Sequence, residues 1–308
     1  MKRFLFTGIL VTVVLLTSSA QSNGEIIARI PVTFPAYDEV KDISWYYDKL
    51  SYDNAVQDKS IKYEKITYTS DGLKVIAYVT SQAGKENEKF PVIIFNRGSF
   101  IRNDIAYVHA PLFQKLVREG FIVVAPALRQ SEGGEGKDEL GGGDLQDVMN
   151  VSPMLKKLHA DTSNVFMLGE SRGGMMTYMA LKKGFTVRAV ATVGAITDLA
   201  AYVAERPWDE NNLKNLWRDY EENRKTILED RSVMAWSGAI NTPALILHGG
   251  KDPQVKPEHA LKLAQAFSAQ GLSYELRIFY EGNHILSGTA TNERDAMVIG
   301  WFRKFMAK

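Results

Sequence analysis

The stretch that most constrains the fold of this chain is residues 164–176, NVFMLGESRGGMM, in which an apolar run passes through a single serine into a second apolar segment. A serine on so sharp a strand-to-helix turn takes a strained backbone conformation, and the residues two positions to either side must lack bulk. Gly169 and Gly173 meet that requirement, and Gly174 extends it. We therefore predict a buried strand, a tight turn that exposes Ser171, and a helix.

The apolar pattern around this stretch predicts an α/β fold with a mostly parallel twisted sheet flanked by helices. Apolar runs over residues 91–96 and 121–126 flank a helical pattern over 106–119, which is typical of a strand–helix–strand crossover with both strand faces buried. The alternation continues with helix 144–159, strand 165–168, helix 172–183, strand 188–193, strand 243–247, helix 257–270, strand 274–279 and helix 292–306.

Three further segments complete the expected domain organisation. Residues 61–69 and 73–80 alternate around Asp71-Gly72, which predicts an antiparallel pair at a sheet edge. Residues 198–238 are polar and helical and interrupt the strand pattern, which indicates a small helical cap insertion. Residues 21–60 show no clear period, so we expect an N-terminal extension lying on a catalytic domain over 61–308.

The first residues have the pattern of a secretory signal. Lys2 and Arg3 precede an apolar run over residues 4–16, and small residues end at Ala20, where we expect cleavage. The run is too short to span a bilayer comfortably, so no stable membrane insertion is expected after cleavage. The chain has no cysteine, which excludes disulfides and a lipid anchor at that junction. We expect an exported protein, periplasmic or extracellular.

Composition narrows the class of partner. At 308 residues with 45% hydrophobic content the chain can bury a large core. Its 37 basic and 36 acidic residues give a net charge of +1 without long runs, which argues against nucleic acid and anionic membranes as partners. Residues 133–136, GGEG, lack the strand-to-helix setting of a phosphate loop. We expect a small substrate, no metal and no cofactor; the sequence indicates no oligomeric state.

A serine hydroxyl is a weak nucleophile, so Ser171 needs a base and an acid that orients the base. On such a sheet the expected chain order is nucleophile, acid, histidine. His284 lies just beyond the last predicted strand, where a loop can carry its ring toward Ser171, and we predict it as the base. We expect His248 to pack beneath the loop it enters, and surface or capping positions for His109, His159 and His259.

Asp252 is the predicted acid. It follows the strand over 243–247 after two glycines, and one helix and one strand fit between it and His284. Asp198, after the preceding strand, is the rival position, and Glu281 is a weaker one.

The oxyanion formed during acyl transfer needs two backbone donors. The first is expected from Arg172, directly after the nucleophile, and the second from the loop after strand 91–96, where the choice between Gly98 and Ser99 stays open. The side chains of Arg97 and Arg172 are either structural or close to an acidic group of the substrate.

Four stretches carry a family resemblance: GESRGG at 169–174, PALILHGGKD at 243–252 with Val255, YEGNH at 280–284, and SEGGEG at 131–136 with GGGDLQD at 141–147. From about Ile61 to the end, the chain resembles an α/β-hydrolase, and more narrowly the catalytic domain of the prolyl oligopeptidase family of serine peptidases, which includes dipeptidyl and acylaminoacyl peptidases. Carried over residue by residue, the resemblance implies that Ser171, Asp252 and His284 form a catalytic triad.

The sequence departs from that family in two places. Family peptidases usually carry a β-propeller of at least four blades, about 40 residues each, and only about forty residues lie between the signal and Ile61. Ser99 also stands where related loops often have a further glycine.

We expect a serine hydrolase acting through an acyl-enzyme, with a peptidase as the leading prediction. The alternatives are a carboxylesterase on small or sugar-linked esters and, in another class, a non-catalytic binding protein.

Overall fold

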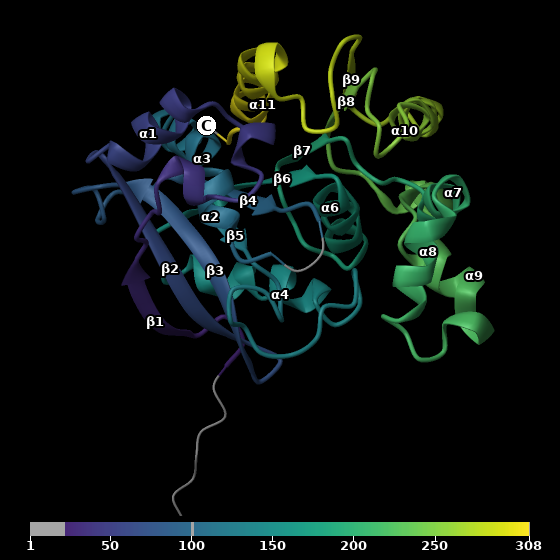
Figure 1. The fold of residues 1–308 in the computed structure, drawn as a ribbon, viewed down its shortest axis with the longest axis horizontal. Helices are drawn as coiled ribbons and strands as arrows, with labels where there is room; N and C mark the ends of the chain where they lie inside the picture. Colours follow the sequence, from purple (N-terminus) through teal and green to yellow (C-terminus); the bar gives the residue numbers. More distant parts are fainter. Residues whose placement is uncertain (1–21, 100–101, 308) are drawn as a thin grey trace, which may run out of the picture.

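The computed structural model describes residues 22–99 and 102–307, and their fold is built on one nine-stranded sheet with the order β1-β2-β3-β5-β4-β6-β7-β8-β9 (Figure 1). The strands are β1 (Ile26–Pro31), β2 (Ile61–Ser70), β3 (Leu73–Gln82), β4 (Pro91–Asn96), β5 (Ile122–Pro126), β6 (Asp161–Glu170), β7 (Ala189–Val193), β8 (Ala244–Gly249) and β9 (Tyr274–Phe279). Strands β4 to β9 pair in parallel, whereas β1, β2 and β3 are antiparallel. The mostly parallel sheet predicted from the sequence is confirmed.

The helices lie on both faces of the sheet (Figure 1). They are α1 (Lys49–Gln57), α2 (Ile105–Val108), α3 (Ala110–Arg118), α4 (Leu145–Met149), α5 (Val151–Leu155), α6 (Arg172–Lys182), α7 (Leu199–Glu205), α8 (Pro207–Lys214), α9 (Tyr220–Asp230), α10 (Glu258–Ala269) and α11 (Thr291–Lys304). Short 3-10 turns are η1 (Tyr37–Glu39), η2 (Ile43–Trp45), η3 (Val233–Ala235), η4 (Ser237–Ala239) and η5 (Gly288–Ala290).

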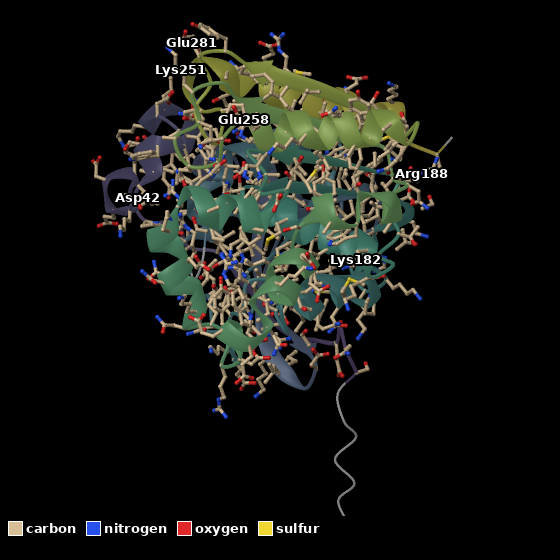
Figure 2. All side chains as sticks on the ribbon, turned by 90° about the vertical axis from the view of Figure 1, so that its right-hand side faces the viewer. Asp42, Lys182, Arg188, Lys251, Glu258 and Glu281 are labelled. Atoms are coloured by element: carbon tan, nitrogen blue, oxygen red, sulfur yellow. The ribbon has the colours of Figure 1, made fainter. Side chains whose placement is uncertain are left out.

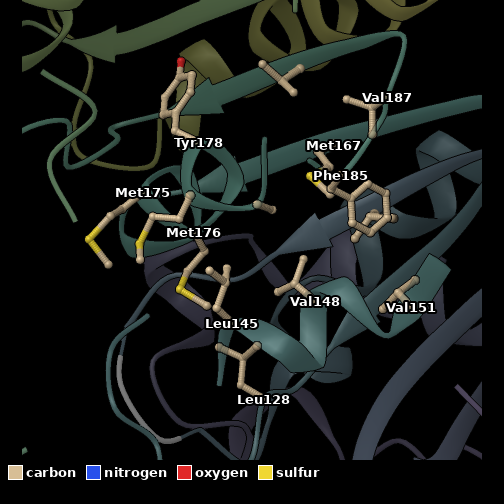
Figure 3. Close-up of a cluster of buried hydrophobic side chains, with 14 of the residues drawn as sticks. Leu128, Leu145, Val148, Val151, Met167, Met175, Met176, Tyr178, Phe185 and Val187 are labelled. Carbon is tan, nitrogen blue, oxygen red and sulfur yellow. The ribbon is translucent and has the colours of Figure 1, made fainter. Parts of the chain in front are cut away.

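Both faces of the central strands are buried, which explains their continuous apolar runs. In β4, Val92 and Ile94 belong to the core under α4, α5, α6 and α10, whereas Ile93 and Phe95 belong to the core under α3 and α11. Figure 3 shows part of the first core, with Met176 and Tyr178 of α6 and the α4 side chains. The period-two geometry of a strand thus sends alternate residues to two separate apolar layers.

Two predicted helices are each divided. The pattern over 106–119 forms α2 and α3, with His109 between them, and Pro111 sits in the first turn of α3 where its missing N–H breaks no helical hydrogen bond. The pattern over 144–159 forms α4 and α5, with Asn150 at the junction. The helical spacing of apolar residues continues through each break, so the sequence pattern alone does not show where one helix ends and the next begins.

The prediction that β2 and β3 form the sheet edge is wrong, because β1 occupies that edge and pairs antiparallel with β2. The register of β1 shifts between Ile26 and Ala28. The last four residues of the strand are exposed, including Ile30 at 55%. A strand without a regularly buried face leaves no alternating pattern in the sequence, which explains why it was missed.

The rest of the N-terminal segment is anchored in the fold rather than simply lying on it. Val40, Ile43 and Tyr52 form a small core with Val108 of α2. The Tyr52 hydroxyl donates a hydrogen bond to the Pro35 carbonyl at 2.9 Å.

The segment between β7 and β8 holds α7, α8, α9, η3 and η4, and it stands in front of the sheet in Figure 2. Arg231, at the end of α9, fixes it to the body: its Nε donates to the Leu140 carbonyl at 2.6 Å, and its guanidinium lies 4.4 Å from the Trp217 ring centroid. We call residues 198–238 the cap. No helix in the part of the chain that the structure describes is long and apolar enough to cross a membrane.

Asp147 of α4 joins three separate segments through hydrogen bonds. Its fully buried carboxylate accepts from Ser70 Oγ at 2.6 Å, from the Arg129 amide at 2.7 Å and from Arg129 Nη2 at 2.8 Å. It thereby links the end of β2, the loop after β5 and α4.

We expect Asp147→Ala to lower the free energy of unfolding by about 3 kcal/mol, because the buried Arg129 guanidinium loses its closest carboxylate and keeps only the exposed Asp71 at 3.3 Å. Asp230→Ala is the matched control, since Asp230 pairs with Lys182 on the surface, and it should change stability by no more than about 1 kcal/mol. Urea unfolding of both variants measures the difference. Equal losses in the two variants would contradict this role of Asp147.

Candidate active site

Ser171 lies at the turn between β6 and α6, with a strained backbone conformation of φ 54° and ψ −121°. A Cβ on Gly169 would come within 2.5 Å of the Gly173 carbonyl oxygen, and one on Gly173 within 1.8 Å of the Asn96 carbonyl oxygen. Neither position has room for a side chain. The predicted strand, turn and helix are confirmed, together with the reason for the flanking glycines.

His284 and Asp252 meet beside this turn. His284 Nδ1 lies 2.7 Å from Asp252 Oδ2, and both side chains are buried. The His284 ring passes over Gly194, where a Cβ would stand 3.0 Å from Nδ1. Because a carboxylate accepts, Nδ1 carries the proton and Nε2 keeps the lone pair.

Asp252 is itself held by several donors. Its Oδ1 accepts hydrogen bonds from the amides of Gln254 at 2.8 Å and Val255 at 3.0 Å. Burial would raise the pKa of Asp252, but the hydrogen bonds from His248, His284 and Val255 outweigh it and hold the pKa well below its ordinary value. The carboxylate is therefore charged at neutral pH.

His248 packs beneath the loop as predicted, and it also supports Asp252, which the sequence did not reveal. Its Nε2 donates to the Val255 carbonyl at 2.9 Å and lies 3.3 Å from Asp252 Oδ2. Its position near the end of β8, four residues before the acid, is the signal that could have found it.

Ser171 and His284 line one cavity of about 470 Å³. In this conformation the Ser171 hydroxyl makes no hydrogen bond to the ring within the described residues, and such bonds often tighten only when substrate binds. The cap contributes an apolar wall to the cavity through Leu199, Tyr202 and Leu213. The opposite wall contains Asp42, Trp45 and Tyr46 of the N-terminal segment.

Gly98 and Ser99 stand next to the nucleophile. A Cβ on Gly98 would lie 3.2 Å from Ser171 Cβ, and Ser99 has a positive φ of 61°. The Gly98 carbonyl accepts from Arg97 Nη1 at 3.0 Å, and the Ser99 carbonyl accepts from Arg172 Nη1 at 3.0 Å. Two guanidinium groups thus fix the orientation of both peptide units.

The side chains of Arg97 and Arg172 are structural, which decides an alternative that the sequence left open. Arg172 binds Asp138 and Asp144 through three contacts of 2.7–2.8 Å. Burial and the neighbouring charge of Arg172 lower the pKa of Arg97 to about 9, so it also stays charged at neutral pH. The four side chains form a buried ionic cluster beneath Ser99.

The remaining candidates lie away from the nucleophile. Asp198 caps α7 by accepting from the Ala201 amide, and Glu281 is exposed and paired with Lys251 (Figure 2). His159 is exposed as expected. His259 and His109 were expected at surface or capping positions, and both are buried. His259 Nδ1 lies 3.3 Å from the Thr197 amide, whereas His109 takes the capping alternative, as the C-cap of α2 and the N-cap of α3.

His109 occupies the junction of α2 and α3, but its ring is buried against Phe95, Phe113 and Tyr46. Burial and the nearby positive charge of Arg102, Arg294 and Arg97 lower its pKa well below the ordinary value, so the ring is neutral.

Within the described residues, no group of three or more His, Asp or Glu side chains is placed to hold a metal ion. A half-buried serine beside a buried histidine and aspartate, in a cavity lined by backbone amides, is an arrangement suited to acyl transfer.

Comparison with known proteins identifies the family. Residues 110–308 match the model of the prolyl oligopeptidase family. The uncharacterized peptidase YtmA of Bacillus subtilis is 24% identical over 202 residues, which is 65% of this chain and 77% of YtmA.

Solved structures share the fold at lower identity. A puromycin-hydrolyzing peptidase of Mycobacterium tuberculosis has a TM-score of 0.67 and 18% identity over 80% of this chain and 39% of its own. An acylaminoacyl peptidase of Pyrococcus horikoshii has a TM-score of 0.64 and 20% sequence identity. The match covers 83% of this chain and 44% of the peptidase. This chain therefore spans less than half of these two larger proteins.

Glu170, directly before the nucleophile, has a displaced pKa that affects stability. Burial raises its pKa from 4.5 to about 7, against the opposing charge of Arg294. Between these values the folded state keeps a proton that the unfolded state releases, so stability falls as pH rises. The total loss is about 3 kcal/mol above pH 7.

We expect Glu170→Gln, which cannot ionise, to lack this pH dependence. Urea unfolding of the wild type and the variant at several values between pH 5 and 8 measures it. A difference between the two proteins that stays constant over this range would show that Glu170 has no raised pKa.

Proposed function

Because the chain belongs to the prolyl oligopeptidase family, we propose that this serine hydrolase is a peptidase that acts through Ser171, His284 and Asp252. The observation that supports the proposal most directly is the 2.7 Å contact between His284 Nδ1 and Asp252 Oδ2 beside a strained serine in the cavity wall.

In this proposal, His284 Nε2 accepts the proton of the Ser171 hydroxyl as the oxygen attacks the substrate carbonyl. The imidazolium that forms is stabilised by Asp252, whose charge is secured by its own hydrogen bonds. His284 then gives the proton to the leaving amine. In the second step water attacks the acyl-enzyme, His284 accepts the proton of the water, and His284 returns a proton to the Ser171 oxygen.

We propose the amides of Arg172 and Ser99 as the donors to the oxyanion. In a trans peptide the N–H points opposite to the preceding C=O. Since the Gly98 carbonyl is held by Arg97, the Ser99 amide points away from that guanidinium. This orientation favours Ser99 over Gly98, the other candidate.

The apolar cap wall supports an apolar side chain on the acyl side of the scissile bond, because Leu199 and Leu213 line the cavity together with Ile196.

We also propose export of the protein. That proposal depends on residues 1–20, which lie outside the described residues.

A fluorophosphonate probe should form a covalent adduct on Ser171, and labelling should be lost in Ser171→Ala and strongly reduced in His284→Ala. Removing both residues should reduce activity by about as much as removing either one, on the order of a millionfold, because the members act as a unit. Probe labelling followed by peptide mapping identifies the residue. An adduct on another serine, or undiminished labelling of His284→Ala, would refute the mechanism.

Asp252→Asn should keep the fold and lose up to about four orders of magnitude in kcat, because an amide favours the unproductive tautomer of His284. Asp198→Asn is the control, since that residue caps α7. Aminoacyl amides and peptidyl amides, set against acetyl and feruloyl esters, are the substrates for the assay. Turnover of esters alone would replace the peptidase with the carboxylesterase alternative.

A further inference from the structure

Glu170 is a buried carboxyl group without a hydrogen-bond partner in the described part of the chain. It is 4% exposed and lines the cavity beside Ser171. The nearest basic group is His109, whose Nδ1 lies 3.9 Å from Oε2, beyond hydrogen-bonding distance, and whose ring is neutral. Because Glu170 lines the cavity, water or a group of a bound ligand can supply a donor to it from there.

The two guanidinium groups near Glu170 are engaged elsewhere. Arg102 binds Asp104 through two contacts of 2.7 Å. Arg294 donates to Asp295 at 2.8 Å and to the Tyr47 hydroxyl at 2.9 Å. Asp295 is also paired with Lys115 at 3.3 Å. Both guanidinium groups therefore give their hydrogen bonds to other acceptors, and neither donates to Glu170 in the described part of the chain.

The wall next to Glu170 is formed by the N-terminal segment. Asp42 and Trp45 line the same cavity, and the Trp45 side chain is 64% exposed. Tyr46 fixes this wall, because its hydroxyl accepts from Arg102 Nη1 at 3.3 Å and its ring meets that of His109 edge-on at 5.3 Å. A carboxylate at the mouth and an aromatic face both attract a cation.

This end of the cavity lies next to the histidine loop. Arg294 Nη1 donates to the Ile285 carbonyl at 2.7 Å, one residue after His284, and the charge of Arg294 acts on Glu170. Because His284 hands its proton to the leaving group, the leaving group lies beside this loop. The cap wall is mainly apolar, and the charged side chain that it contributes to the lining, Arg206, is a cation that does not attract a second one.

We propose that Glu170, with Asp42 and Trp45, forms a subsite for a positively charged group on the leaving-group side of the scissile bond. The inference rests on the proposed function and narrows it to peptides with a lysine or arginine directly after the scissile bond. A bound cation supplies the missing donor and keeps the carboxyl ionised in its buried position.

The test uses peptides that differ only in the residue after the scissile bond, which is lysine, norleucine or glutamate. The wild type should cleave the lysine peptide with a kcat/KM about ten times that of the norleucine peptide, and the glutamate peptide least well. Glu170→Gln should bring the lysine-to-norleucine ratio close to one. Asp42→Asn and Trp45→Ala should each lower it in part.

Glu281→Gln is the matched control, because Glu281 is exposed, pairs with Lys251 and lies outside the cavity (Figure 2). It should leave the ratio unchanged. An unchanged ratio in Glu170→Gln would overturn the subsite, and a preference for lysine before the scissile bond would overturn its placement on the leaving-group side.

A second readout separates this inference from peptidase activity. n-Pentylamine should slow fluorophosphonate labelling of Ser171 in the wild type at concentrations where 1-pentanol does not, and Glu170→Gln should abolish the difference. If no peptide is cleaved while the amine still protects selectively, the peptidase assignment fails and the subsite stands. Equal effects of amine and alcohol would refute the subsite, whatever reaction the enzyme catalyses.

Discussion

The close approach of α6 to the end of β4 is the constraint on which the rest of the site depends. Gly173 allows it, because any side chain there would overlap the Asn96 carbonyl. The approach brings the amides of the loop after β4 beside Ser171 and forces the serine into its positive φ. Such strain persists only where the surroundings hold it in place, and here a nine-stranded, mostly parallel sheet and two apolar cores do so.

Charged side chains have two roles around the site. Beneath it they hold the backbone of a loop in position, and within it they act on the groups proposed for the reaction. The cluster of Arg97, Arg172 and their aspartates is buried and paired, and it fixes carbonyl groups of the loop beside the nucleophile. Asp252 is likewise satisfied on every side. Glu170 differs from both, because it lines the cavity and its carboxyl group makes no hydrogen bond within the described residues.

The walls of the cavity come from segments outside the regular strand–helix repeat. The cap provides apolar side chains, and the N-terminal segment provides Asp42, Trp45 and Tyr46. In Figure 1 these two segments lie on different sides of α6. The sequence indicated an extension lying on the domain, whereas the structure gives it a place in the site itself.

The sequence by itself determined the parallel sheet, the turn at Ser171 and the chain order of Ser171, Asp252 and His284, because apolar periods and glycine positions are local properties. The sequence did not predict β1, because a strand with exposed residues has no alternating apolar pattern. It also did not show that His248 supports Asp252. Only the tertiary structure decided that Arg97 and Arg172 are structural and that Glu170 is buried and makes no hydrogen bond through its carboxyl group to the other described residues. Burial and pairing depend on residues far apart in the chain, and no local pattern records which distant side chains will meet.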